Sequence, residues 1–191
     1  MRTRLILLLV ALLAGCVTPP ARVDTPRTEA QDKSYSVDLP VGWIKQWTPE
    51  NNLIVSRDGY LLETIGIVHQ PLAKAYPKTK KEASVTALPA ELAELEIAEL
   101  KATNEQLAAL KVLENEPALL SGKEGYRLKV AYKNQRGLEY QRVVYGVADK
   151  SGYYSLDYFA PTLYYFDKYY PAFERAVDSF QLTAAPGTAK K

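Results

Sequence analysis

Cysteine, histidine and methionine each occur only once in this chain of 191 residues. Because Cys16 is the only cysteine, the chain cannot form an internal disulfide, and His69 cannot build a multi-histidine metal site by itself. The sequence also lacks a Gly-x-Ser-x-Gly elbow, a Gly-x-Gly-x-x-Gly turn and a phosphate loop. We therefore predict no metal, no cofactor and no catalytic residue, and a structural role for His69 at the end of a strand.

An excess of charge of one sign is also missing. The chain has 24 basic and 22 acidic residues, and two of the basic ones, Arg2 and Arg4, lie at the extreme N-terminus. The only local cluster is Lys78, Lys80 and Lys81, which is typical of a solvated loop. The balance predicts that the protein does not bind nucleic acid.

Only one long apolar run is present, Leu5–Leu13, and it follows the basic start. It is shorter than the ~20 residues that span a bilayer, and small residues follow it, as in a secretory signal. The next residues resemble the lipobox of bacterial lipoproteins: Leu13-Ala14-Gly15-Cys16. The resemblance implies that residues 1–15 are a signal peptide and that Cys16 carries the lipid. The alternative is an ordinary secretory signal that is cut elsewhere.

A lipid on Cys16 would anchor the protein in the membrane of the cell envelope. Val17 follows in place of Asp, which by analogy with lipoprotein sorting in bacteria with two membranes favours the periplasmic face of the outer membrane. Residues 16–33 are rich in proline and polar residues and are predicted to be the lipidated Cys and a flexible tether. We expect a single domain over 34–182 and a disordered tail over 183–191.

The domain shows alternating apolar segments and two helical patterns, so its predicted class is α+β. Pro89 begins a long helix that extends to about residue 111, with Leu92 and Leu95 on its buried face. Ile97 and Leu100 lie beside that face and either widen it or form a groove for a partner. A second helix begins near 171. Strands are expected at 34–39, 43–47, 53–56, 60–68, 126–132, 138–147 and 153–159, with one more possible over 112–120.

Three segments, Leu39–Trp43, Glu116–Ala118 and Val177–Phe180, resemble structural positions shared by one family. This family includes the photosystem subunit PsbP, the Mog-type Ran-binding proteins and many short bacterial lipoproteins. The resemblance implies an antiparallel sheet of about six strands sandwiched between helices. It also implies a binding or assembly factor without a shared catalytic residue.

Tyrosine is unusually frequent, with 14 Tyr against 4 Phe and 2 Trp. Clustered aromatic side chains either cover the edge of a sheet or mark an interaction site. The candidate binding patch consists of Tyr164, Tyr165, Phe166, Tyr169 and Tyr170. We expect this patch to bind another envelope protein or peptide.

Two carboxylates in a cleft could act as a catalytic pair on a glycosidic bond. Glu114 with Glu116, and Asp157 with Asp167, are the candidate pairs, and all are expected to be solvated surface residues, as is Glu63. The predicted function is a membrane-anchored, non-catalytic binding or assembly module. The alternatives are a cell-envelope enzyme that acts on glycan and a purely structural spacer.

Overall fold

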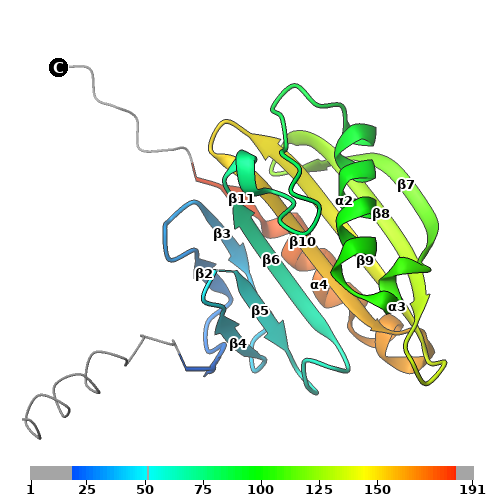
Figure 1. Cartoon of the computed structure of the whole chain (residues 1–191). Helices are drawn as coiled ribbons and strands as arrows, with labels where there is room; N and C mark the ends of the chain where they lie inside the picture. The colour runs from blue at the N-terminus through cyan, green and yellow to red at the C-terminus, as the bar shows by residue number, and fades with distance from the viewer. Residues whose placement is uncertain (1–18, 51, 184–191) are drawn as a thin grey trace, which may run out of the picture.

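The computed structural model describes residues 19–50 and 52–183, which form two antiparallel sheets and a small set of helices (Figure 1). The main sheet has eight strands in the order β1-β4-β5-β6-β10-β9-β8-β7, and the second has three in the order β11-β3-β2. The main-sheet strands are β1 (Ala21–Arg22), β4 (Ile44–Trp47), β5 (Leu53–Ser56), β6 (Thr64–Gln70), β10 (Gly152–Pro161), β9 (Glu139–Asp149), β8 (Lys123–Lys133) and β7 (Lys111–Leu120). The small sheet contains β2 (Arg27–Glu29), β3 (Tyr35–Asp38) and β11 (Gln181–Leu182).

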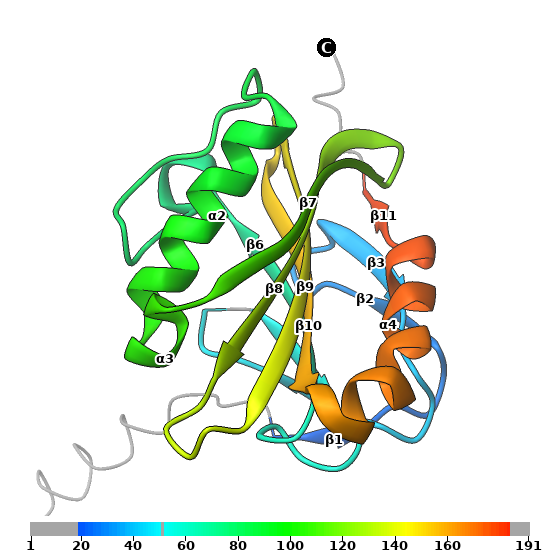
Figure 2. The same cartoon turned by 90° about the vertical axis from the view of Figure 1, so that its right-hand side faces the viewer.

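The helices lie on both faces of the main sheet, as Figure 2 shows. They are α2 (Pro89–Thr103), α3 (Glu105–Ala108) and α4 (Asp167–Ser179), with the short turns η1 (Leu72–Lys74) and η2 (Thr162–Phe166). Helices α2 and α3 cover one face, while α4 and the small sheet cover the other. The predicted α+β class, with an antiparallel sheet between helices, is confirmed. The predicted number of six strands is wrong, because edge strands β1 and β7 extend the sheet to eight.

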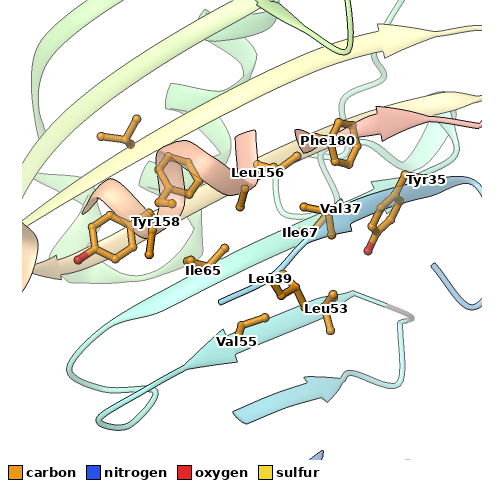
Figure 3. Packing of buried hydrophobic residues seen from close by; sticks show 14 of the residues in the cluster. Tyr35, Val37, Leu39, Leu53, Val55, Ile65, Ile67, Leu156, Tyr158 and Phe180 are labelled. Atoms are coloured by element: carbon orange, nitrogen blue, oxygen red, sulfur yellow. The ribbon is translucent and has the colours of Figure 1, made fainter. Parts of the chain in front are cut away.

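Strand β10 lies in the middle of the sheet and is buried on both faces. Tyr154, Leu156 and Tyr158 pack on the α4 side, whereas Tyr153 packs on the α2 side. Side chains that alternate along a strand point to opposite faces, so one strand supplies both cores. The α4-side core is apolar and aromatic, and Figure 3 shows Leu156, Tyr158 and neighbouring side chains packed together.

Helix α2 ends at Thr103, earlier than predicted, because Asn104 starts the separate turn α3. The Asn104 side chain accepts a hydrogen bond from the Leu107 amide at 3.0 Å, which caps α3. The buried face of α2 is also rotated about the helix axis relative to the prediction, because Leu95 is only half-buried. The helix buries Leu92, Ala93, Glu96, Ile97, Glu99 and Leu100. The wider buried face thus explains Ile97 and Leu100.

The prediction of a flexible tether over 16–33 is wrong for the residues that the structure describes. Strand β1 pairs with β4 and β2 pairs with β3, and Val23 and Ala30 are buried in the α4-side core. These strands are only two and three residues long, and prolines separate their apolar residues, so no strand period was visible. The domain therefore begins before residue 34. Cys16, residues 1–15 and nearly all of the predicted tail lie outside the described residues.

His69 contacts two other parts of the domain. Its Nδ1 lies 2.8 Å from Asp32 Oδ2, and its ring stacks on Tyr154 at 4.4 Å between centroids. Asp32 belongs to the segment that was expected to be a tether, so this contact fixes that segment to the end of β6. Burial raises the pKa of Asp32, but hydrogen bonds from Ser34 and His69 outweigh this effect and lower it overall.

Candidate functional site

The five residues of the predicted aromatic patch occupy different environments. Tyr164 is 63% exposed, whereas Phe166 is buried in the α4-side core. Tyr165, Tyr169 and Tyr170 are half-buried and pack against that core. Within the five-residue candidate patch, one ring is therefore freely exposed and three neighbours are partly exposed, while Phe166 belongs to the core.

The turn after β10 determines this separation. Tyr164 has a left-handed φ of 72°, an uncommon value for a residue other than glycine. Hydrogen bonds from β10 hold this turn in place: the Tyr158 hydroxyl donates to the carbonyl oxygens of Tyr165 at 2.9 Å and Phe166 at 3.1 Å. The chain reversal sends Phe166 into the core and leaves Leu163 and Tyr164 outside.

Lys168 lies among the rings of this segment. Its Nζ is 4.9 Å from the ring centroid of Tyr164, 5.7 Å from that of Tyr165 and 4.5 Å from that of Tyr169, distances typical of cation–π contacts. Asp58, from the turn before β6, accepts hydrogen bonds from the Tyr169 hydroxyl at 2.5 Å and Lys168 Nζ at 3.2 Å. The hydrogen bond from Tyr169, with a contribution from Lys168, lowers the pKa of Asp58.

Two leucines extend the exposed apolar surface at this end of the sheet. Leu163 is 80% exposed and Leu61 is 86% exposed. The Tyr140 hydroxyl donates to the Leu61 carbonyl oxygen at 3.2 Å, and Tyr140 pairs in the sheet with Pro161, so the two turns lie close together. We call Leu61, Leu163, Tyr164 and Lys168 the aromatic end. Neither leucine belonged to the predicted patch, although each adjoins a tyrosine in a turn-rich segment.

A hollow of about 870 Å³ lies beside the aromatic end, between α4 and the turn that leads into β4. The Trp43 ring meets the Tyr169 ring edge-on at 5.1 Å between centroids. The hollow is lined by Leu39, Trp43, Tyr169, Ala172, Arg175 and Asp178, among others. The Leu39–Trp43 segment, which suggested the family resemblance, thus forms one wall of the hollow.

The chain enters the domain near the aromatic end. In β1, Arg22 pairs with Ile44, the neighbour of Trp43, and Trp43 contacts Tyr169. Figure 2 shows β1 and the start of α4 at the same end of the molecule. The first strand of the described chain therefore lies at the aromatic end.

A second hollow, which we call the α2 cavity, lies on the other face of the main sheet. It has a volume of about 650 Å³ and lies between α2, the 71–81 loop and strands β6, β9 and β10. Its lining includes Val68, Glu96, Leu100, Arg142, Tyr153 and Asp157. Arg142 pairs with Asp157 at 2.7 Å between Nη2 and Oδ2. Local sequence patterns give no sign of this site, because Glu96 and Arg142 sit in ordinary helix and strand patterns.

The structure places the two predicted carboxylate pairs differently. Glu114 and Glu116 lie beside each other, because both bind Arg127 Nη1, but they do so on the exposed edge of the sheet. The surface prediction is wrong for Asp157, which is buried on the α2 side, whereas Asp167 begins α4 on the opposite face. Glu63 is also buried: its Oε1 accepts hydrogen bonds from the amides of Arg57 at 2.5 Å and Asp58 at 2.7 Å and from the Ser56 hydroxyl at 3.1 Å.

Metal-ligand clusters and membrane spans are both absent from the described part of the chain. No group of three or more His, Cys, Asp or Glu side chains within residues 19–50 and 52–183 could hold a metal ion. No helix in these two ranges is long and apolar enough to cross a membrane.

Comparison with solved structures identifies the fold as PsbP/Mog-like. The solution structure of cyanobacterial PsbP (CyanoP) from Synechocystis sp. PCC 6803 has a TM-score of 0.60 at 12% identity, covering 90% of this chain and 99% of that chain. The Ran-binding protein Mog1p of Saccharomyces cerevisiae has a TM-score of 0.50 at 12% identity, covering 84% and 96%. A protein of Bacteroides thetaiotaomicron has a TM-score of 0.55 at 10% identity, covering 86% and 51%.

No protein-family model and no curated protein sequence matches this chain. The structural likeness, at identities of 10–12%, establishes the shared fold and no more. The predicted resemblance to PsbP and the Mog-type proteins is thereby confirmed at the level of the fold.

Proposed function

We propose that this protein is a membrane-anchored lipoprotein of the cell envelope whose folded domain binds another envelope protein or peptide without catalysing a reaction. The lipobox-like Leu13–Cys16 segment supports the anchor, and Val17 supports the periplasmic face of the outer membrane. The fold supports a binding role by analogy, because Mog1p, which shares it, is named for binding the protein Ran.

The exposed aromatic end is the observation that carries the binding role. Leu61, Leu163 and Tyr164 are each more than half exposed, although burial of such side chains is favourable. Exposed apolar residues gathered beside a cation are typical of protein interaction sites, where tyrosine is enriched among the residues that dominate affinity. The hollow beside Trp43 and Tyr169 would receive a side chain of the partner.

The anchor would also determine which end of the domain faces the bilayer. Four residues separate Cys16 from Ala21 in β1, and the five residue steps between them span at most about 18 Å when fully extended. A lipid on Cys16 would hold the aromatic end close to the membrane surface, because β1 lies at this end. The partner is therefore expected to be a protein embedded in, or anchored to, the same membrane. The spacer alternative loses support, since the segment expected to supply its reach is folded.

Crosslinking in intact cells tests the binding role. The double variant Leu163→Ser with Tyr164→Ala removes the exposed apolar groups, so we expect loss of the crosslinked partner with little change in Tm. Leu119→Ser is the matched control, because Leu119 is also exposed but lies on β7, the far edge of the sheet. Equal crosslinking by the double variant and the wild type would contradict the proposal.

The anchor has its own test. A Cys16→Ser variant is expected to leave the membrane fraction, and labelled palmitate is expected on the wild type alone. Retention of the variant in the membrane after processing would contradict lipidation at this position.

The glycan-enzyme alternative has one supporting observation, the presence of Glu96 and Asp157 in the α2 cavity. However, Asp157 Oδ2 is bound by Arg142 at 2.7 Å and Glu96 Oε2 accepts from the Tyr153 hydroxyl at 2.9 Å. Both carboxylates are thus held by the protein, which favours ligand binding over attack on a glycosidic bond.

A further inference from the structure

The α2 cavity is a built polar site on the face of the sheet opposite the aromatic end. Glu96 is only 8% exposed and Asp157 only 6% exposed, yet both line the cavity. The 650 Å³ volume lies within the range of about 300–1,000 Å³ that is typical of small-molecule sites. Val68 and Leu100 supply an apolar part of the wall.

The two carboxylates have free hydrogen-bonding capacity. Glu96 Oε2 accepts from the Tyr153 hydroxyl, and Asp157 Oδ2 pairs with Arg142. An ionised carboxylate offers about four acceptor positions, so each group can accept further hydrogen bonds from a ligand in the cavity. Gly66 makes room for Asp157, because a Cβ at Gly66 would clash with Asp157 Oδ1.

The floor of the cavity has more negative than positive groups. Arg142 is the cation beside Glu96 and Asp157 at the floor, whereas the lysines of the described lining, Lys74, Lys80 and Lys81, lie at the mouth. The remaining carboxylate near the floor, Glu99, binds the loop. Glu99 accepts the amides of Lys78 at 2.7 Å and Thr79 at 2.8 Å and so fixes the loop. A ligand ammonium at the floor would offset the charge that Glu96 carries when it is ionised.

The rim has the opposite character. Lys74, Lys80 and Lys81 are exposed at the mouth of the cavity, and none forms an ion pair within the described part of the chain. Glu50 and Glu82 are acidic residues near them. A bare cation would have to pass this basic rim, whereas a ligand with an anionic group would be attracted by it.

We propose that the α2 cavity binds a small zwitterion, a free amino acid or short peptide, with its ammonium group between Glu96 and Asp157 and its carboxylate at the lysine rim. The volume accommodates a peptide of a few small residues. Tyr153 holds Glu96 in position from the floor, and the Tyr126 hydroxyl lies 2.6 Å from the Tyr153 hydroxyl, behind it.

Ammonium binding would be linked to pH. Burial raises the pKa of Glu96; Arg142 from β9 opposes this effect and Asp157 from β10 reinforces it. Tyr76, Tyr126 and Tyr153 also face this group, and burial raises the pKa of each hydroxyl, so they stay neutral. A ligand ammonium favours the ionised carboxylate, so affinity rises with pH until Glu96 is ionised without ligand.

Calorimetric titration of the full chain tests the proposal with five probes: trialanine, ethylamine, acetate, glycerophosphoethanolamine and chitotriose. We expect trialanine to bind more tightly than the single-charge probes, with an affinity that increases as pH rises. Tighter binding of glycerophosphoethanolamine would assign the zwitterion site to a lipid headgroup and overturn the amino-acid assignment. Binding of chitotriose alone, or of no probe, would overturn the proposal.

Matched variants test whether Glu96 and the rim lysines are the residues that bind trialanine. Glu96→Gln keeps the shape of the side chain and removes its charge, so trialanine affinity should fall about 10- to 100-fold, the range of a charge-assisted hydrogen bond. Glu94→Gln, exposed on the same helix, should bind as the wild type does. Lys74→Gln with Lys80→Gln and Lys81→Gln should reduce the preference for trialanine over ethylamine. If Glu96→Gln folds and binds trialanine as tightly as the wild type does, the assignment is wrong.

Discussion

The two faces of the main sheet are both covered by a helix, yet they are filled with different chemistry. On the α4 side, Phe173 and Phe180 pack against Leu156 and Tyr158 in a continuous apolar core. On the α2 side, the helix brings Glu96 down towards Arg142 and Asp157. A helix can therefore close a sheet by apolar packing alone, or it can close it around a polar cavity.

The α4 side of the sheet contributes mainly to stability, whereas the charged α2 side is the better candidate for function. A closed apolar core contributes free energy through burial and is costly to disturb. A buried group of charges contributes little or negative net stability, because desolvation offsets the attraction between them. Retention of charge under α2 is thus better explained by ligand binding than by the stability of the fold.

The α4 side should give the largest loss of stability. Phe173→Ala removes a fully buried ring that contacts Tyr145 and Tyr158, so the free energy of unfolding should fall by about 3–5 kcal/mol. Urea denaturation followed by circular dichroism measures this change. Tyr164→Ala on the exposed turn is the control and should change stability by less than about 0.5 kcal/mol. Similar losses in both variants would show that the aromatic end is part of the core.

Overpacking on the α2 side should have the next largest effect. A Cβ at Gly146 would clash with the Tyr126 ring, which is fixed by the hydroxyl contact with Tyr153. Gly146→Ala should therefore cost about 1–3 kcal/mol. Combining it with Tyr126→Phe leaves the ring in place, so the loss should persist; recovery of stability would mean that the hydroxyl contact, and not the ring, restricts the space.

Glu96→Gln, unlike the two variants above, should increase the free energy of unfolding. The pKa of Glu96 is raised by burial, so the folded state holds the proton more tightly than the unfolded state, and stability falls as pH rises from about 4.5 towards the folded pKa. The variant lacks this loss and should be more stable than the wild type at neutral pH, by about 1.4 kcal/mol for each tenfold difference in proton affinity between the folded and unfolded states. Thermal denaturation across pH 4–8 measures the difference. A constant difference between the two proteins would contradict a buried ionisable group.

Asp32→Asn should have the smallest effect. The pKa of Asp32 is lowered in the folded state, so its contribution is present at neutral pH and is lost as pH falls through the acidic range. The side chain is 40% exposed, so solvent screening limits the contribution to about 1 kcal/mol or less. A larger loss, with faster hydrogen exchange in residues 27–36, would show that the pair with His69 holds the N-terminal strands in place.

Local patterns made several of these features predictable. The meander from β8 to β10 alternates clearly, and Pro89 marks the start of α2. Short or irregular elements were missed, because two or three residues are too few to show the alternation of apolar and polar side chains that marks a strand. Strand β1 depends on pairing with β4, and the turn at Tyr164 depends on hydrogen bonds from Tyr158. The aromatic patch was predicted in the right segment, but burial of Phe166 depends on contacts that local patterns do not contain.

The sequence alone determined the class of the fold and the central hairpins, since each follows from local periodicity. Only the tertiary structure decided which side chains face which core. Glu96 and Asp157 lie 61 positions apart and line one cavity because α2 packs on β8 and β9, next to β10 in the sheet. Residues that are distant in the chain become neighbours only through packing, so a site built from them is visible only in the folded protein.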